Sequence, residues 1–119
     1  MNHKKDLHIM KQHRFLQEAG KRLNQMREIR RDLHQHPELA TQEARTSRIV
    51  ADYLKHLGLD VRTGVGGHGV VATLSAKEAG KCVALRADMD ALPMEEKNTV
   101  PYASSRSGVA HCCGHDGHT

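Results

Sequence analysis

The chain has 119 residues and a formal net charge of +4. This length fits one small domain at most, because domains cluster around about 100–150 residues. Leu, Ile, Val and Phe make up only 23 of the 119 residues and Trp is absent, so little apolar surface is available for a core. No apolar stretch reaches the roughly 20 residues of a membrane-spanning helix, and no secretory signal or disulfide framework is visible. We therefore expect reduced thiols and a cytoplasmic protein.

Positive charge is concentrated in the first third of the chain. Residues 1–35 contain nine Lys and Arg against four Asp and Glu, whereas residues 36–119 contain nine against ten. A basic segment can bind nucleic acid or an acidic membrane surface. Only one aromatic residue, Phe15, lies in this segment to stack on a base. We interpret it as the solvated face of a helix and expect neither a nucleic-acid nor a membrane partner.

The first predicted element is an amphipathic helix from His13 to Gln35, because apolar residues recur there at steps of three and four. Pro37 ends it, since the residue before a proline is pushed away from helical angles. Residues 1–12 are expected to be frayed or disordered. The expected buried stripe consists of Leu16, Ala19, Leu23, Met26, Ile29 and Leu33.

A second helix is predicted from Gln42 to Leu57, with Thr41 as its N-cap and Gly58 as the left-handed residue that closes it. Its expected buried stripe consists of Ile49, Val50, Tyr53, Leu54 and Leu57.

Short apolar runs after the second helix predict strands at residues 59–63, 70–74 and 82–87. The third run is continuously apolar around Cys82, which is typical of a strand buried on both faces. Beyond Asp90 we expect loop, with no closing helix or strand. Two helices followed by strands indicate a layered α/β unit.

Two clusters of polar residues are candidates for chemistry. Asp88 and Asp90 follow the third predicted strand, where α/β folds place their sites, although solvated acids at a strand end are equally compatible. The second cluster consists of His111, Cys112, Cys113, His115, Asp116 and His118. Thiolate and imidazole are preferred ligands of zinc and similar metals, and Gly114 allows the chain to present Cys113 and His115 to one ion.

This second cluster does not make a complete metal site on its own, because a catalytic zinc usually has three protein ligands. His111, Asp116 and His118 are candidates for partners that orient the ligands. The remaining ligands are either Asp88 or Asp90, or they are missing from this chain.

Four successive motifs resemble signatures of the peptidase M20 amidohydrolases. They occupy residues 31–39, 66–72, 84–93 and 111–119, in the order and at the spacing of that family. The similarity is to the branch of N-acyl-amino-acid amidohydrolases, hippurate hydrolases, aminobenzoyl-glutamate hydrolases and plant auxin-conjugate hydrolases. It implies that residues 13–119 are the N-terminal portion of a three-layer α/β, metallo-aminopeptidase-like catalytic domain. The rest of that domain and its inserted lid or dimerisation domain are then absent.

The resemblance also implies a chemistry. Family members bind two divalent metal ions, for which zinc, manganese, cobalt and nickel all suit a mixed S, N and O donor set, and they hydrolyse the amide bond of small N-acyl amino acids. By similarity Cys113 and His115 are metal ligands, Asp90 orients a ligand, and Asp88 supports the site without binding metal. The other ligands and the general-base glutamate come from later segments, so no catalytic residue is expected in this chain.

Two of the departures from the family pattern concern the candidate site and the length of the chain. Cys112 stands where the family usually has Ala, and Thr119 is the last residue, where relatives begin a helix. We therefore expect the isolated chain to carry an incomplete site and to be inactive, whereas complete relatives form homodimers or homotetramers. The alternatives are a non-catalytic truncated remnant and a small metal-binding module.

Overall fold

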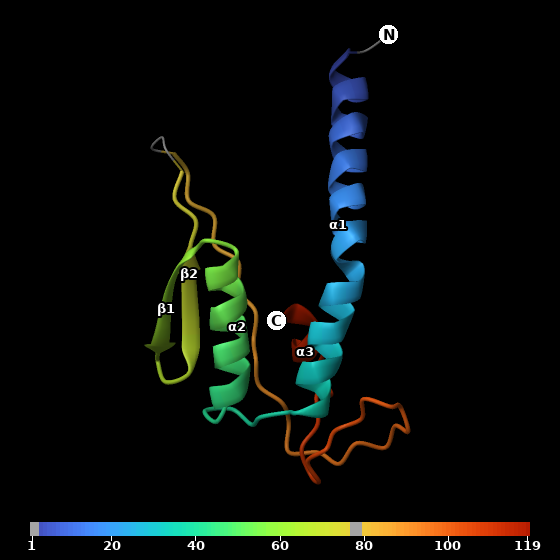
Figure 1. Cartoon of the computed structure of the whole chain (residues 1–119), viewed down its shortest axis with the longest axis vertical. Helices are drawn as coiled ribbons and strands as arrows, with labels where there is room; N and C mark the ends of the chain where they lie inside the picture. The colour runs from blue at the N-terminus through green and yellow to red at the C-terminus, as the bar shows by residue number, and fades with distance from the viewer. Residues whose placement is uncertain (1–2, 77–79) are drawn as a thin grey trace.

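Three helices and one β-hairpin form the regular structure of the described residues, 3–76 and 80–119, in a computed structural model (Figure 1). The elements are α1 (His3–Gln35), α2 (Ala44–His56), β1 (Asp60–Val65), β2 (Gly69–Thr73) and α3 (His115–His118). The hairpin packs on α2, while α3 lies beside the C-terminal part of α1. In these described ranges no helix is long and apolar enough to cross a membrane.

Helix α1 ends at Gln35, as Pro37 predicts, but it begins at His3 rather than at His13. That residues 1–12 are frayed or disordered remains a prediction, and residues 1 and 2 lie outside the described residues. The expected buried stripe is wrong for most of its length: Leu33 is buried, whereas Leu16 is 70% exposed. The reason is visible in Figure 1, where the N-terminal part of α1 extends beyond every other element. Only the last turns of α1 meet the rest of the described chain.

Helix α2 is capped by a carboxylate from outside the helix. Glu38 accepts hydrogen bonds from the backbone N–H groups of Arg45 (3.0 Å) and Thr46 (2.7 Å), one on each oxygen. The predicted cap by Thr41 is wrong: Thr41 has a left-handed φ of 68°, and Glu43 occupies the N-cap without a side-chain hydrogen bond. Burial alone would raise the pKa of Glu38, but these two N–H groups lower it below its ordinary value.

Replacing Glu38 by alanine is expected to lower the free energy of unfolding by about 1–2 kcal/mol, because two N–H groups at the start of α2 lose a charged acceptor. Urea unfolding followed by circular dichroism measures the change. Glu43→Ala is the matched control, since that side chain makes no capping hydrogen bond. Equal losses in the two variants would contradict a capping role for Glu38.

The buried side of α2 differs from the predicted stripe. Thr46, Ser47 and Ala51 are the buried residues of the helix, and Leu57 is 47% exposed. Gly58 follows the helix with a φ of 80°, which confirms its predicted closing role. The small buried residues reflect close packing of α2 against the hairpin and the segment that precedes the helix.

The antiparallel hairpin confirms two of the predicted strands with small shifts at their ends. Its register pairs Asp60 with Thr73 and Thr63 with Val70, and a bulge between Thr63 and Val65 separates these from the last pair. A Cβ at Gly69 would collide with the carbonyl oxygen of Val65, its partner in the hairpin, so the close pairing of these two residues requires glycine at position 69.

The prediction of a buried strand at residues 82–87 is wrong for this structure. The segment is extended but unpaired, with Val83 83% and Leu85 97% exposed. Cys82, expected in the core, is exposed as well. A strand buried on both faces needs neighbours on its edges and faces, and among the described residues no strand pairs with this segment. The apolar pattern therefore marks a segment without its packing partners.

The core of the described residues is small, as the lean composition predicts. Its apolar members are Leu33, Ala51, Ala91, Val109 and Ala110. Isolated bridges pair Leu39 with Ala91 and Leu92 with Ala110, and so tie the residues after Asp90 to the rest of the chain. The expectation of no further helix is also wrong, because α3 forms directly after Gly114, whose φ is 83°.

Candidate metal centre

His115 opens α3 and is held by the backbone and side chain of Asp90. Its Nδ1 lies 2.9 Å from the Asp90 carbonyl oxygen and 3.0 Å from the Asp90 carboxylate. Both neighbours are acceptors, so Nδ1 carries the proton and donates to them, which leaves Nε2 with its lone pair. A carboxylate on the far nitrogen of an imidazole is the usual support of a metal-binding histidine.

Cys113 precedes the left-handed residue Gly114, and its side chain is exposed. A thiol and an imidazole nitrogen on either side of one glycine form a donor pair that suits a borderline metal. Within residues 13–76 and 80–119, whose side chains the structure describes, no three His, Cys, Asp or Glu side chains gather closely enough to hold an ion. The donor pair fits a divalent metal in its chemistry, but it is not a complete set of ligands.

The carboxylate of Asp88 bonds to Arg86 and makes no hydrogen bond to His115 among the described residues. The hydrogen bond from Arg86 measures 2.7 Å, and the Asp88 carbonyl oxygen accepts one from the Thr119 hydroxyl at 2.9 Å. His118 stacks near His115, with ring centroids 6.1 Å apart, and is exposed. Of the two aspartates, the structure therefore brings Asp90 alone into hydrogen-bond contact with His115.

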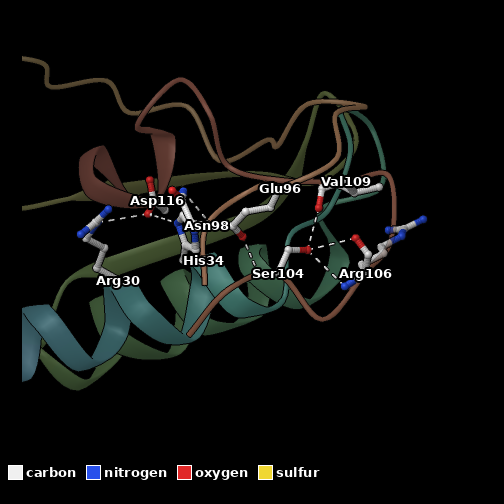
Figure 2. A network of polar contacts seen from close by, with 8 residues as sticks. All are labelled: Arg30, His34, Glu96, Asn98, Ser104, Arg106, Val109 and Asp116. Carbon is white, nitrogen blue, oxygen red and sulfur yellow. Dashed lines mark hydrogen bonds and ion pairs between the residues drawn. The ribbon is translucent and has the colours of Figure 1, made fainter. Parts of the chain in front are cut away.

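Asp116 fixes α3 to α1 through a buried ionic network (Figure 2). Its Oδ2 accepts a hydrogen bond from His34 Nδ1 at 2.8 Å and one from Arg30 Nε at 3.1 Å. His34 and Arg30 lie one turn apart on α1, so both face α3. Asp116 is 4% exposed and follows His115 directly. The contact therefore fixes the position of the candidate ligand as well as that of the helix.

The second ring nitrogen of His34 joins another segment to the same network. Its Nε2 lies 3.0 Å from Glu96, whose other oxygen accepts a hydrogen bond from the Ser104 backbone N–H at 2.6 Å. Burial alone would lower the pKa of His34, but its hydrogen bonds to Glu96 and Asp116 raise it. The hydrogen bond from His34 lowers the pKa of Glu96. Because a carboxylate lies beside each ring nitrogen, the network favours the imidazolium form of His34.

Ser104 extends the network into the loop that leads to the metal motif. Its hydroxyl lies 2.6 Å from the carbonyl oxygen of Val109 and 3.1 Å from the backbone nitrogen of Arg106 (Figure 2). This arrangement folds residues 104–109 into a tight turn. His111 and the cysteine pair follow this turn along the chain.

His111 is buried at 7% exposure, and neither of its ring nitrogens has a hydrogen-bond partner among the described residues. Burial lowers its pKa, so the imidazole is neutral near pH 7. Its ring lies 6.3 Å from that of His34. His111 makes no hydrogen bond to His115, and an orienting role for it stays a prediction.

Sequence reasoning missed the part played by Arg30, His34 and Glu96. The sequence alone assigned no role to His34, whereas the structure uses both of its nitrogens in ion pairs. The available signal was the spacing of Arg30 and His34 on one helix face. No pattern in a single sequence indicates that this face meets a carboxylate more than 80 residues later.

Comparisons with known proteins agree with this geometry. The model of peptidase family M20/M25/M40 matches residues 84–119, which contain Asp90 and the whole His/Cys cluster. YhaA of Bacillus subtilis is 54% identical over 95 residues, which cover 80% of this chain and 24% of that protein. Residues 84–119 of this chain belong to peptidase family M20.

Two further M20-type relatives extend the comparison. The N-acyl-L-amino acid amidohydrolase of Geobacillus stearothermophilus is 48% identical over 90 residues, covering 76% of this chain and 24% of the relative. The solved structure of Bacillus subtilis YXEP, described as a dinuclear metal-binding peptidase of the M20 family, superposes with a TM-score of 0.73 at 38% identity, covering 78% and 26% of the two chains. The predicted α/β fold of an N-terminal M20 segment is thereby confirmed. The chain spans about a quarter of the length of these relatives.

Proposed function

We propose that this chain is the N-terminal part of a metal-dependent amidohydrolase that cleaves the amide bond of N-acyl amino acids. The observation that carries the proposal is the contact of His115 Nδ1 with Asp90, which leaves Nε2 available, while the exposed thiol of Cys113 lies two residues earlier in the chain. The family membership and the named activity of the Geobacillus stearothermophilus relative support the substrate class.

Each residue of the candidate site has a defined task in this proposal. Cys113 and His115 hold a divalent metal, which when bound polarises an amide carbonyl and lowers the pKa of its water. Asp90 keeps the proton of His115 on Nδ1 and fixes the ring. Asp116, through His34 and Arg30, keeps α3 in place against α1.

The proposal assigns the remaining functional groups to sequence beyond these residues. We propose that two metal ions of the zinc, manganese, cobalt or nickel type bind the complete site, and that a glutamate outside this chain is the general base. The isolated chain is then inactive, because groups that act as a unit give little rate when most are removed. A cytoplasmic location and a homodimer or homotetramer complete the proposal for the whole protein.

A chimera tests this function directly. The N-terminal segment of the Geobacillus stearothermophilus amidohydrolase is replaced by the 90 residues of this chain that align with it. We expect the chimera to hydrolyse N-acetyl amino acids in the presence of divalent metal, and the isolated 119-residue chain to show no turnover. A folded chimera that binds metal but never hydrolyses any N-acyl amino acid would contradict the proposal.

In the same chimera, Asp90→Asn is expected to weaken metal affinity about 10–100-fold, because removing the carboxylate that orients a ligating histidine has this effect. Metal competition with a chromogenic chelator measures the affinity. Asp88→Asn is the matched control, since the Asp88 carboxylate contacts exposed Arg86 and not His115. If the two variants lose affinity equally, the orienting role of Asp90 is wrong.

A further inference from the structure

Cys112 and Cys113 are adjacent in sequence, and both are free and exposed. They lie outside any helix or strand, directly before Gly114. Cys112 also lines an open cavity of about 530 Å³, together with His34 and His111. A small oxidant in solution can therefore reach the pair. Nothing in the proposed hydrolysis uses Cys112.

We propose that Cys112 is the resolving thiol of Cys113, so that a peroxide converts the pair into a reversible vicinal disulfide that withdraws Cys113 from metal binding. The disulfide itself depends only on the two thiols. The loss of metal binding rests on the proposed function.

The chemistry proceeds in two balanced steps. The Cys113 thiolate attacks hydrogen peroxide, which forms an S–O bond, breaks the O–O bond and releases hydroxide, leaving a sulfenic acid. The Cys112 thiol then attacks the sulfenic sulfur, which forms the S–S bond and releases water. Each sulfur has lost one electron, and the peroxide has gained two. Without Cys112 the sulfenic acid persists and a second peroxide oxidises it to irreversible sulfinic acid.

The geometry makes such a disulfide easy to reduce. Neighbouring Cα atoms across a trans peptide are about 3.8 Å apart, whereas disulfide-linked Cα atoms usually lie about 4.4–6.8 Å apart. The ring formed by adjacent cysteines is therefore strained, and strained or exposed disulfides are the labile ones. The irregular backbone before Gly114 can accommodate the strain without breaking a helix or a strand. We therefore expect a disulfide that forms and is reduced reversibly, rather than a permanent structural cross-link.

The test uses the 119-residue chain with Cys82→Ala, which removes the third exposed thiol. After peroxide treatment without metal, peptide mass spectrometry should show that the peptide containing Cys112 and Cys113 has lost two hydrogen atoms. Dithiothreitol should restore them. Adding Cys112→Ala should redirect the product to a Cys113 that has gained two oxygen atoms and resists dithiothreitol. Because both side chains are exposed, these substitutions remove no core contact.

Two results would overturn the resolving role. One is equal sulfinic acid at Cys113 with and without Cys112, and the other is a disulfide that joins two chains instead of neighbouring residues. Cobalt uptake provides the separate readout, since the thiolate–cobalt absorption should vanish on oxidation and return with dithiothreitol. Absorption that survives disulfide formation would contradict the metal role of Cys113 in the proposed function, while the mass result would still support the resolving role.

Discussion

Replacing His34 by alanine lowers the free energy of unfolding by about 3–5 kcal/mol, the cost of breaking a buried ion pair by removing one partner. His34 donates to Asp116 and Glu96, and the side chains of those two acids are 1% and 7% exposed. The substitution leaves Glu96 without its cationic partner and Asp116 with Arg30 as its remaining one. Urea unfolding followed by circular dichroism measures the loss.

His36→Ala is the control for this prediction. Its imidazole pairs with Asp32 at 3.3 Å, and both side chains are 42% exposed. A pair exposed to this extent contributes about 0.2–1 kcal/mol. Similar small losses in the His34 and His36 variants would show that the network around Asp116 does not stabilise the fold.

The same network predicts a pH dependence with a definite sign. The pKa of His34 is raised above its ordinary 6.5, so its contribution is complete below pH 6.5 and is lost as the pH rises through the raised value. The pKa of Glu96 is lowered below 4.5, so its contribution is complete above pH 4.5 and is lost as the pH falls through the lowered value. His111, with a lowered pKa, adds a rise in stability as the pH increases towards 6.5.

Unfolding free energies measured across the pH range check this dependence. The chain should lose stability on the alkaline side of pH 6.5, and the His34→Ala variant should lack that alkaline loss. If the stability of the His34→Ala variant falls with rising pH as steeply as that of the wild type, a group other than His34 causes the loss.

Cys113→Ser in the chimera is expected to reduce amide hydrolysis by more than about 100-fold, because losing a ligand exceeds the 10–100-fold effect of losing a ligand's supporting group. A serine hydroxyl stays protonated where a thiol ionises on a metal. Steady-state rates at saturating metal, with metal content measured in parallel, give the result. Cys112→Ser is the control and should retain activity and metal. If Cys112→Ser loses activity and metal while Cys113→Ser keeps them, Cys112 and not Cys113 is the ligand.

Local pattern was sufficient for much of the backbone. Pro37 and Gly58 mark the ends of the first two helices, and both hairpin strands form near their predicted positions. Burial was harder to predict because it depends on what covers a surface. Leu23 sits on an apolar stripe and Leu85 in an apolar run, yet they are 54% and 97% exposed. Periodicity identifies the face that is suited to packing, but it does not supply the partner.

The candidate site, like the fold, could be predicted from the sequence only in its local part. The spacing of Cys113 and His115 is local, so sequence alone indicates the donor pair. An orienting role for Asp90 was expected only through the family resemblance, and its contact with His115 was not predicted. The ion pairs of His34 span more than 60 residues to Glu96 and more than 80 to Asp116. Contacts of this kind arise from tertiary packing and leave no periodic trace in one sequence.

An anaerobic cobalt titration of the 119-residue chain tests the central claim, that Cys113 and His115 form part of a metal site, most directly. We predict weak binding with a thiolate–cobalt absorption band that disappears in Cys113→Ser and in His115→Ala and remains in Cys112→Ser. A band that is unchanged by Cys113→Ser, or that depends on Cys112 instead, would contradict the account.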